Sequence, residues 1–490
     1  MGETTGETAC GTPRLPDVLT GIATQLSELT DVGDLTEEEA LAVVTAAERV
    51  KASVAAVQAR ACTEFVTQRD AEVARDRAAE KISRREAGQR QSAARSEVAL
   101  ARRCSPFQAD RHIAHGRALC SVLPHTMAAL TAGDLSEHRA EIIARETTCL
   151  SPQHRREVDA RVADTLPQLG DKALTAAVQR ACIDVDQASI VERRRRAAED
   201  RCVSIRPAPD GMARLSVLGP LADVVGAYAS LRAAEAARWV ATGDPEVDAA
   251  RAADERGRGA WLADTALERL SGRAEGQAQP VEVGLVISDT ALFPSAGTGS
   301  EGEYVEVPGW GAIPAADARD HLLRLLDEDH PDADDAKVWL RRLFTSPDGR
   351  DLVAMDSRRR FFTGALRSLI ELRDPTCRIP WCDAPTREVD HARSAAAGGP
   401  TSTTNALGLC QRHNLTKESP GWRVSITGTG LDPGGGPHAA LVSTPTGNEF
   451  TSVAAPLLGH GRVRGRPVRA ARPATSTIEV LYAGALHTAA

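Results

Sequence analysis

The chain has 490 residues, 42% of them hydrophobic, and a formal net charge of −8. This length predicts two to four domains with real cores, and the composition excludes a wholly disordered chain. The negative balance also excludes a protein whose whole surface is basic and coats nucleic acid.

Cysteine usage and the absence of apolar runs indicate the compartment. Seven of the ten cysteines lie singly in the first 202 residues, at irregular spacing that does not indicate a disulfide framework. The N-terminal sequence lacks the apolar core of a secretory signal and the Ser or Thr at position six that myristoylation prefers, and no apolar run approaches transmembrane length. We therefore expect a cytoplasmic protein with reduced cysteines and no membrane partner.

The first part of the chain is predicted to be mainly helical. We expect a disordered N-terminus over residues 1–34 and a helical domain over 35–293. Thr36 and Glu39 form a capping box before apolar residues at helical spacing. Ser151-Pro152 is a helix start with proline at the first helical position.

The pattern changes near residue 202, where alternation predicts a small β-hairpin insertion around Pro209-Asp210-Gly211. The remaining predicted segments are helices over 221–240 and 261–270, a strand over 281–287, a linker and connecting elements over 294–355, a small α+β domain over 356–427, a C-terminal hairpin over 428–460 and a flexible Arg-rich tail over 461–490. The fold class is thus a mainly α N-terminal region followed by a small α+β domain.

Three of the ten cysteines lie between residues 377 and 410, together with a histidine in a metal-ligand spacing. Cys377-x4-Cys382 and Cys410-x2-His413 supply four soft or borderline ligands, which is an accepted set for a closed, tetrahedral zinc site. This segment is short and rich in turns, so a metal crosslink would supply folding energy that packing cannot. The sequence therefore predicts a structural zinc site.

Other polar residues in this segment are not needed by a zinc site. Residues 388–391 read as a strand that ends at Asp390-His391, residues 406–409 as a second strand, and residues 410–418 as a short helix. Successive helical residues project about 100° apart, so His413 can face the zinc while Asn414 faces the strands. Asn414 and Lys417 share one face of the helix.

These residues carry a resemblance to a known family. The pattern Asp-His, Gly-Gly-Pro, Asn and Cys-x2-His-Asn-x2-Lys over residues 390–417 resembles the ββα-metal domain of HNH endonucleases, in the subtype whose last histidine is replaced by asparagine. The longer context through Lys417-Glu-Ser-Pro-Gly-Trp422 resembles the actinobacterial repeat-encoded HNH proteins, in which a helical region of unknown function precedes the nuclease. The resemblance covers residues 35–455.

The resemblance implies a role for each matching residue. His391 would be the general base that activates water for attack on a phosphodiester. Asp390 and Asn414 would hold one divalent ion, Mg²⁺ or another, against the scissile phosphate. Asn405 would either orient His391 or stabilise the strand and loop geometry.

DNA is the expected partner, and basic residues near the motif are its expected contacts. Residues 351–422 hold ten Arg and Lys against eight Asp and Glu, a slightly basic region in an acidic chain. Arg393, Arg412 and Lys417 are candidate nucleic-acid contacts, although Lys417 fits a solvated helix surface equally well. The four-arginine run at 193–196 is a candidate DNA contact too, but a solvated helix terminus is the favoured interpretation.

The leading hypothesis is a metal-dependent DNA endonuclease with a structural zinc site. Its helical region would dock DNA, bind a protein partner or mediate self-association. The alternative is a non-catalytic zinc module that binds nucleic acid or protein, and a third interpretation is a helical scaffold that the C-terminal module only stabilises. Retention of Asp390, His391, Asn405 and Asn414 together favours the nuclease, because a purely structural zinc site needs none of them.

Overall fold

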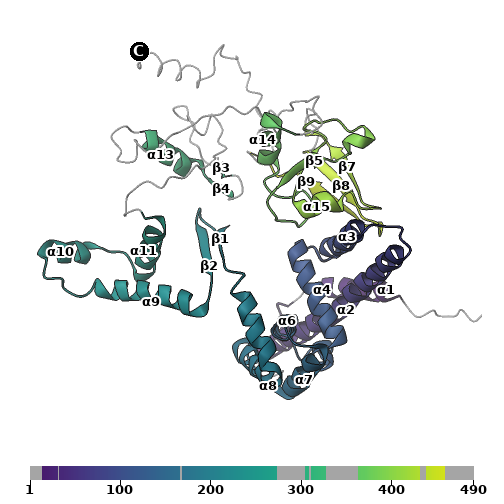
Figure 1. Cartoon of the computed structure of the whole chain (residues 1–490), viewed down its shortest axis with the longest axis horizontal. Helices are drawn as coiled ribbons and strands as arrows, with labels where there is room; N and C mark the ends of the chain where they lie inside the picture. The colour runs from purple at the N-terminus through teal and green to yellow at the C-terminus, as the bar shows by residue number, and fades with distance from the viewer. Residues whose placement is uncertain are drawn as a thin grey trace, which may run out of the picture. The chain divides into compact units, whose positions relative to one another are not determined.

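The computed structural model of the chain describes residues 14–30, 32–165, 168–272, 304–307, 311–326, 362–430 and 437–457 (Figure 1). Two compact units are present, Met1–Glu64 with Ala114–Ile190, and Phe65–Ile113 with Val191–Ala490. The N-terminal region is mainly helical with small hairpins, and the C-terminal region combines short helices with small antiparallel sheets. The expected fold class is confirmed.

The first unit is assembled from helices around one apolar core. Its largest fully buried side chains include Leu123, Leu130, Ile143 and Leu174. The unit contains α1 (Leu15–Ser27), α5 (Pro124–Ala132), α6 (Glu137–Glu146), α7 (Pro152–Val162) and the short 3₁₀ turn η1 (Ala163–Thr165), together with parts of α2 (Glu37–Ala78), α4 (Pro106–Ser121) and α8 (Asp171–Ala197).

Helix starts in this unit follow from local chemistry. The capping box before α2 is confirmed, since the Thr36 N–H donates to Glu39 Oε2 at 2.9 Å and the Glu39 N–H donates to Thr36 Oγ1 at 3.3 Å. At the start of α5, the buried carboxylate of Asp159 accepts the N–H groups of His125 at 2.7 Å and Thr126 at 3.1 Å. An anion at a helix N-terminus satisfies donors that the helix itself leaves unpaired.

Helix α1 overturns one expectation. It lies within residues 1–34, where the sequence led us to expect disorder, although none of its residues is buried. Pro16 in its first turn is pre-set for helical φ, and Leu15, Val18 and Ile22 recur at helical spacing. The prediction is therefore wrong for Leu15–Ser27, and residues 1–13 lie outside the described residues.

The middle of the chain carries the expected hairpin and helices. Strands β1 (Cys202–Pro207) and β2 (Ala213–Leu218) pair antiparallel, and Asp210 and Gly211 take positive φ in their turn. Helices α9 (Leu221–Ala237) and α11 (Arg258–Ser271) match two predictions, whereas α10 (Pro245–Ala253) was not expected. The four-arginine run ends α8, and Arg195 and Arg196 both contact Glu192 of the same helix, as a solvated terminus would.

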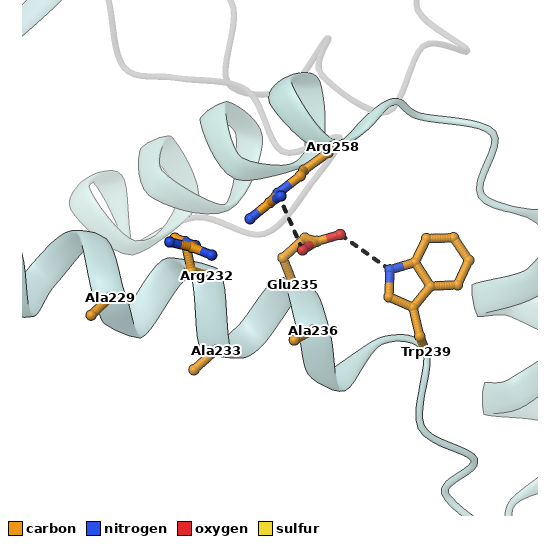
Figure 2. A pocket seen from close by; sticks show the side chains of 7 residues that line it. All are labelled: Ala229, Arg232, Ala233, Glu235, Ala236, Trp239 and Arg258. Atoms are coloured by element: carbon orange, nitrogen blue, oxygen red, sulfur yellow. Dashed lines mark hydrogen bonds and ion pairs between the residues drawn. The ribbon is translucent and has the colours of Figure 1, made fainter.

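Figure 2 shows a cavity of about 580 Å³ where α9 meets α11. Glu235 is buried there; its Oε1 accepts a hydrogen bond from the Trp239 indole at 3.1 Å, and its Oε2 lies 3.5 Å from Arg258 Nε. Both carboxylate oxygens of Glu235 therefore have partners, and the ion pair with Arg258 links α9 to α11. We assign this cavity a structural role.

Between this region and the C-terminal module, a hairpin of β3 (Tyr304–Val307) and β4 (Gly311–Pro314) precedes α13 (Ala315–Leu326), in the segment predicted to connect the domains. The expected strand at 281–287, the Gly/Ser-rich stretch at 294–303 and the tail at 461–490 lie outside the described residues. Among the described residues, no helix is long and apolar enough to cross a membrane.

The C-terminal module contains the predicted strand, strand and helix. Strands β5 and β6 pair antiparallel with Asp390 opposite Leu407 and His391 opposite Ala406. The elements of the module are α14 (Gly364–Arg373), β5 (Glu388–His391), η2 (Ala395–Ala397), β6 (Ala406–Leu409), α15 (Gln411–Thr416), β7 (Arg423–Gly428), β8 (Ala439–Ser443) and β9 (Glu449–Val453).

The last three strands correct the predicted domain ends. A hairpin was expected over 428–460, but β7, β8 and β9 form a three-stranded antiparallel sheet that begins at Arg423. The predicted boundary after residue 427 cuts through β7. The alternation of Val424-Ser-Ile426 and Ala440-Leu-Val442 does indicate the pairing of β7 with β8, whereas the third strand, β9, was not expected.

A buried network of charges joins this sheet to the β5–β6 hairpin. Asp374 is 1% exposed, and its carboxylate binds the guanidinium groups of Arg373 at 2.7 Å and Arg378 at 2.9 Å and the Gly408 N–H at 2.9 Å. Arg378 in turn donates to the Ser452 hydroxyl of β9 at 3.1 Å. Burial alone would raise the pKa of Asp374, but the two arginines hold it below its usual value, so the carboxylate stays charged.

Part of the helical region belongs to the C-terminal module. Helix α3 (Arg84–Arg102) contributes Ala93 and Leu100 to the core that contains Leu407 and Leu409 of β6 and Trp422. The carboxylate of Glu97, also on α3, accepts a hydrogen bond from the Thr446 hydroxyl at 2.8 Å. The C-terminal module is therefore packed on a helix more than 250 residues earlier in the chain.

His438 generates a pH prediction for this module. Burial, and then the charges of Arg373 and Arg378, lower the pKa of His438 from 6.5 to about 4. The unfolded chain protonates this histidine near pH 6.5 and the folded chain does not, so folding stability should fall as the pH drops from about 6.5 to about 4. The contribution lost is roughly 3 kcal/mol.

The measurement is hydrogen exchange of β8 and β9 peptides between pH 4 and pH 7, corrected for the intrinsic pH dependence of exchange. His438→Gln should flatten the profile, because it removes the titrating group while keeping a donor for the Thr404 carbonyl, which His438 Nε2 contacts at 3.0 Å. Equal pH profiles for both proteins would show that His438 does not carry this dependence.

Candidate functional site

The four predicted zinc ligands meet in one buried cluster. Their ligand atoms all lie within 4.8 Å of one another. Cys377 Sγ is 3.4 Å from His413 Nδ1, Cys410 Sγ is 3.6 Å from the same nitrogen, and Cys382 Sγ is 3.9 Å from Cys410 Sγ. Tetrahedral zinc with bonds near 2.3 Å to sulfur and 2.0–2.1 Å to nitrogen requires edges of about 3.6–3.8 Å. The cluster is compatible with structural zinc.

The four ligands of the cluster are positioned by the first turn of α15 and by the loop that carries Cys377 and Cys382. Cys410 is the N-cap of α15, and its Sγ accepts the His413 N–H at 3.5 Å, so both C-terminal ligands belong to the first turn of one helix. The first pair lies in a loop closed by a hydrogen bond from the Cys377 N–H to the Ala384 carbonyl at 2.8 Å. Trp381 takes φ +60° in that loop, which accommodates the four-residue spacing between the two cysteines.

The charges in the cluster also suit a cation. Hydrogen bonds from the thiols of Cys377 and Cys382 lower the pKa of Cys410, whereas hydrogen bonds with Cys382 and then Cys410 raise the pKa of Cys377. Without a metal the three sulfurs share their protons, because neighbouring thiolates repel one another at this distance. A divalent ion would neutralise several thiolates at once, which is how such sites gain folding energy.

The predicted general base lies at the end of β5. His391 is buried and its ring packs on Phe362, with ring centroids 4.7 Å apart. Its Nε2 is 2.9 Å from the Thr401 hydroxyl and its Nδ1 is 3.3 Å from Asp390 Oδ1. The His391 N–H also donates to that Asp390 oxygen at 2.8 Å. Each ring nitrogen of His391 therefore has an oxygen atom of Thr401 or Asp390 within hydrogen-bond distance.

Polar residues of β5 and α15 face one another in pairs. Asp390 Oδ2 accepts from the Lys417 ammonium at 2.9 Å, and Glu388 Oε2 accepts from the side-chain amide of Asn414. Burial alone would raise the pKa of Asp390, but Lys417 and the His391 N–H lower it below its usual value. Asn414 Oδ1 is buried and has no hydrogen-bond partner among the described residues. An ionised carboxylate and an unpaired amide oxygen are hard donors of the kind Mg²⁺ prefers.

Asn405 holds the loop that follows β5. Its Oδ1 accepts the Arg393 N–H at 2.9 Å, and its amide donates to the carbonyls of Arg393 at 3.0 Å and Pro400 at 2.9 Å. No hydrogen bond to His391 is present among the described residues. A Cβ at Gly399 would lie 1.8 Å from the Arg393 carbonyl oxygen, so only glycine fits this loop. Asn405 was expected either to orient His391 or to stabilise the strand and loop geometry, and its contacts fit the second role.

Two of the three expected nucleic-acid contacts are used inside the chain. Arg412 forms a two-pronged ion pair with Asp110 at 2.6 and 3.2 Å and donates to the Ser96 hydroxyl. Lys417 has a side chain only 4% exposed because it is paired with Asp390, so it neither lies on a solvated surface nor is free to meet a phosphate. Both side chains are engaged within the chain in this structure, and their contact with nucleic acid stays a prediction. Arg393 is exposed, as a phosphate contact requires.

Sequence reasoning missed Glu388 and Thr401. Glu388 precedes Asp390 by two residues, and the two-residue period of a strand places both on one face, so the pairing with α15 could have been anticipated. Thr401 had no comparable signal, because its contact with His391 depends on how the glycine loop folds back.

Comparison with known proteins leaves the family open. No family model and no solved structure matches this chain. An uncharacterized protein of Mycobacterium tuberculosis is 41% identical over 61 residues, which are 12% of this chain and 12% of that protein. A match of this length carries no argument about activity.

The tetrad predicts a zinc dependence that two variants can separate. Cys382→Ser should lose about one zinc ion per chain and destabilise the C-terminal module, because three ligands hold a structural ion poorly. Cys202→Ser, an exposed cysteine outside the cluster, should keep its zinc. Metal content by mass spectrometry after gel filtration is the measurement. Full zinc occupancy in Cys382→Ser would contradict the assignment.

Proposed function

We propose that the chain is a metal-dependent DNA endonuclease of the HNH kind, in which the Cys₃His tetrad binds zinc and His391 acts as the general base. The observation that carries the proposal is the set of polar contacts between β5 and α15 beside the tetrad. Asp390, His391 and Asn414 all lie there, and a structural zinc site needs none of them.

His391 has the surroundings of a base. A neutral imidazole has one unprotonated nitrogen. A water that displaces the oxygen atom now in contact with this nitrogen can give it a proton while the water oxygen bonds to phosphorus. The bond from phosphorus to the 3′ oxygen then breaks, and this leaving oxygen takes a proton from solvent. The imidazolium formed has the Asp390 carboxylate and the Thr401 hydroxyl as acceptors, and both stabilise it.

Asp390 and Asn414 are the residues that would hold a divalent ion. The lowered pKa of Asp390 keeps its carboxylate charged, and Asn414 Oδ1 has no partner to lose among the described residues. The Asn414 amide nitrogen must face Glu388, since two oxygens would repel one another, and this orientation leaves the amide oxygen for a cation. A bound ion would stabilise the negative charge that develops on the phosphate and the leaving oxygen.

One observation favours the alternative of a non-catalytic zinc module. The Lys417 ammonium already neutralises Asp390, and a buried lysine can take the electrostatic place of an ion. In that case the β5–α15 pairs serve stability, and the module binds nucleic acid or protein without cleaving it. Activity therefore requires that the ion compete with Lys417 for the carboxylate.

Cleavage of supercoiled plasmid tests the proposal. The zinc-loaded chain should nick DNA with Mg²⁺ or Mn²⁺, and His391→Ala should lower the rate about 10²–10⁴-fold, because a general base contributes that much. Mapped product ends should carry 5′-phosphate.

The matched control is His154→Ala, which removes a histidine from the first unit, where it contacts Asp186 at 3.2 Å. It should cleave at the unaltered rate, and every variant should keep its zinc. If the unaltered chain and His391→Ala are equally inert with Mg²⁺, Mn²⁺ and Ni²⁺ on several forms of DNA, the non-catalytic module is the better description.

A further inference from the structure

A second cavity, of about 640 Å³, adjoins the proposed active site. Asn405 and Lys417 form part of its lining, and Lys417 is the residue that contacts Asp390. The rest of the lining includes Arg393 and Ser394 from the loop after β5 and Arg423 and Ser425 from β7. The cavity therefore lies between the β5–β6 hairpin and the three-stranded sheet of β7, β8 and β9.

The polar groups in this lining are mostly hydrogen-bond donors. Arg393 and Arg423 are both exposed. Within the described part of the chain, Arg393 bonds through its Nε to the Ala397 carbonyl at 3.0 Å, and its two terminal nitrogens lie outside that bond. The acidic residue of the lining is Glu418, and its carboxylate is paired with Lys417. The cavity thus has a net positive charge.

An unpaired donor lies in the wall of the same cavity. Trp422 is 6% exposed, and its indole Nε1–H is buried with no hydrogen-bond partner among the described residues. A buried donor without a partner costs about 1–3 kcal/mol, so such a group calls for a ligand or a water. The indole and the aliphatic side chains of β7 also give the wall an apolar surface, against which a sugar or base can pack.

We propose that this cavity binds one nucleotide of the DNA strand next to the scissile phosphodiester. Arg393 and Arg423 contact its backbone phosphate, and Trp422 borders the sugar or base. The volume is too large for a phosphate alone and suits a phosphate with its sugar and base. The proposal rests on the proposed function, because it places the cavity on the path of the cleaved strand.

Binding measured without cleavage tests the inference. The zinc-loaded full chain is titrated into fluorescein-labelled duplex and single-stranded DNA without added divalent ion, and anisotropy is recorded over a series of salt concentrations. The double variant Arg393→Gln/Arg423→Gln should bind about tenfold more weakly at moderate salt, and the slope of log K against log salt should decrease by roughly 2.

Matched controls separate the cavity from general charge. Arg387→Gln removes one exposed arginine of the same module outside the cavity lining, and Arg367→Gln removes another from α14; together they change the net charge as much as the double variant does. Because Arg393 also bonds the Ala397 carbonyl, Arg423→Gln alone provides a variant with that loop intact. Trp422→Phe keeps a smaller aromatic ring and removes the N–H, and a severalfold loss of affinity is expected. Zinc content verifies folding in each case.

The outcomes distinguish this inference from the proposed function. If the unaltered chain does not bind DNA, or if the double variant binds with the affinity and salt slope of the control pair, the cavity is not a nucleotide site, even when plasmid is cleaved. If the double variant loses affinity while the unaltered chain never cleaves, the nucleotide site stands and the nuclease proposal fails. Preferential binding of one DNA form identifies the strand geometry that the cavity accepts.

Discussion

The C-terminal module depends on crosslinking two segments that have little core of their own. The loop with Cys377 and Cys382 and the first turn of α15 with Cys410 and His413 converge to within 4.8 Å. Two four-residue strands and a six-residue helix bury too little surface to fix such a helix by packing. The tetrad and the contacts of α15 with α3 together set the position of α15, and that position sets which side chains face β5. The contacts of Glu388 with Asn414 and of Asp390 with Lys417 follow from that placement.

The buried charges around Asp374 carry the same constraint into the rest of the module. One carboxylate, two guanidinium groups and the neutral ring of His438 connect the segment before the zinc loop to β6 and to the last sheet. Such a network adds little net stability compared with an apolar core, but removing one member leaves an unpaired buried charge. It therefore favours one arrangement of the sheets. The cavity beside the site owes its shape to that arrangement, because β7 forms one wall.

Helix α15 shows how one short element serves several purposes. His413 points to the tetrad, Asn414 to Glu388, Lys417 to Asp390, and Arg412 to Asp110 of α4. A helix advances about 100° per residue, so neighbouring positions reach different partners. The consequence for function is that the cations near the motif are mostly occupied. In the function proposed above, contact with a nucleic-acid backbone would therefore involve Arg393 and Arg423, which belong to a loop and a strand rather than to the helix.

The local features of this protein were predictable from its residues. Ligand spacing identified the tetrad, the two-residue period and turn chemistry identified β5, β6 and the β1–β2 hairpin, and helical geometry separated His413 from Asn414. These features depend on neighbours in the chain. Three features became visible only in the folded chain: the partner of Arg412, which lies 302 residues away, the burial of Lys417 against Asp390, and the addition of β9 to the hairpin of β7 and β8. The residue type gives the charge and length of a side chain. Its partner, in contrast, depends on which distant segments pack against it.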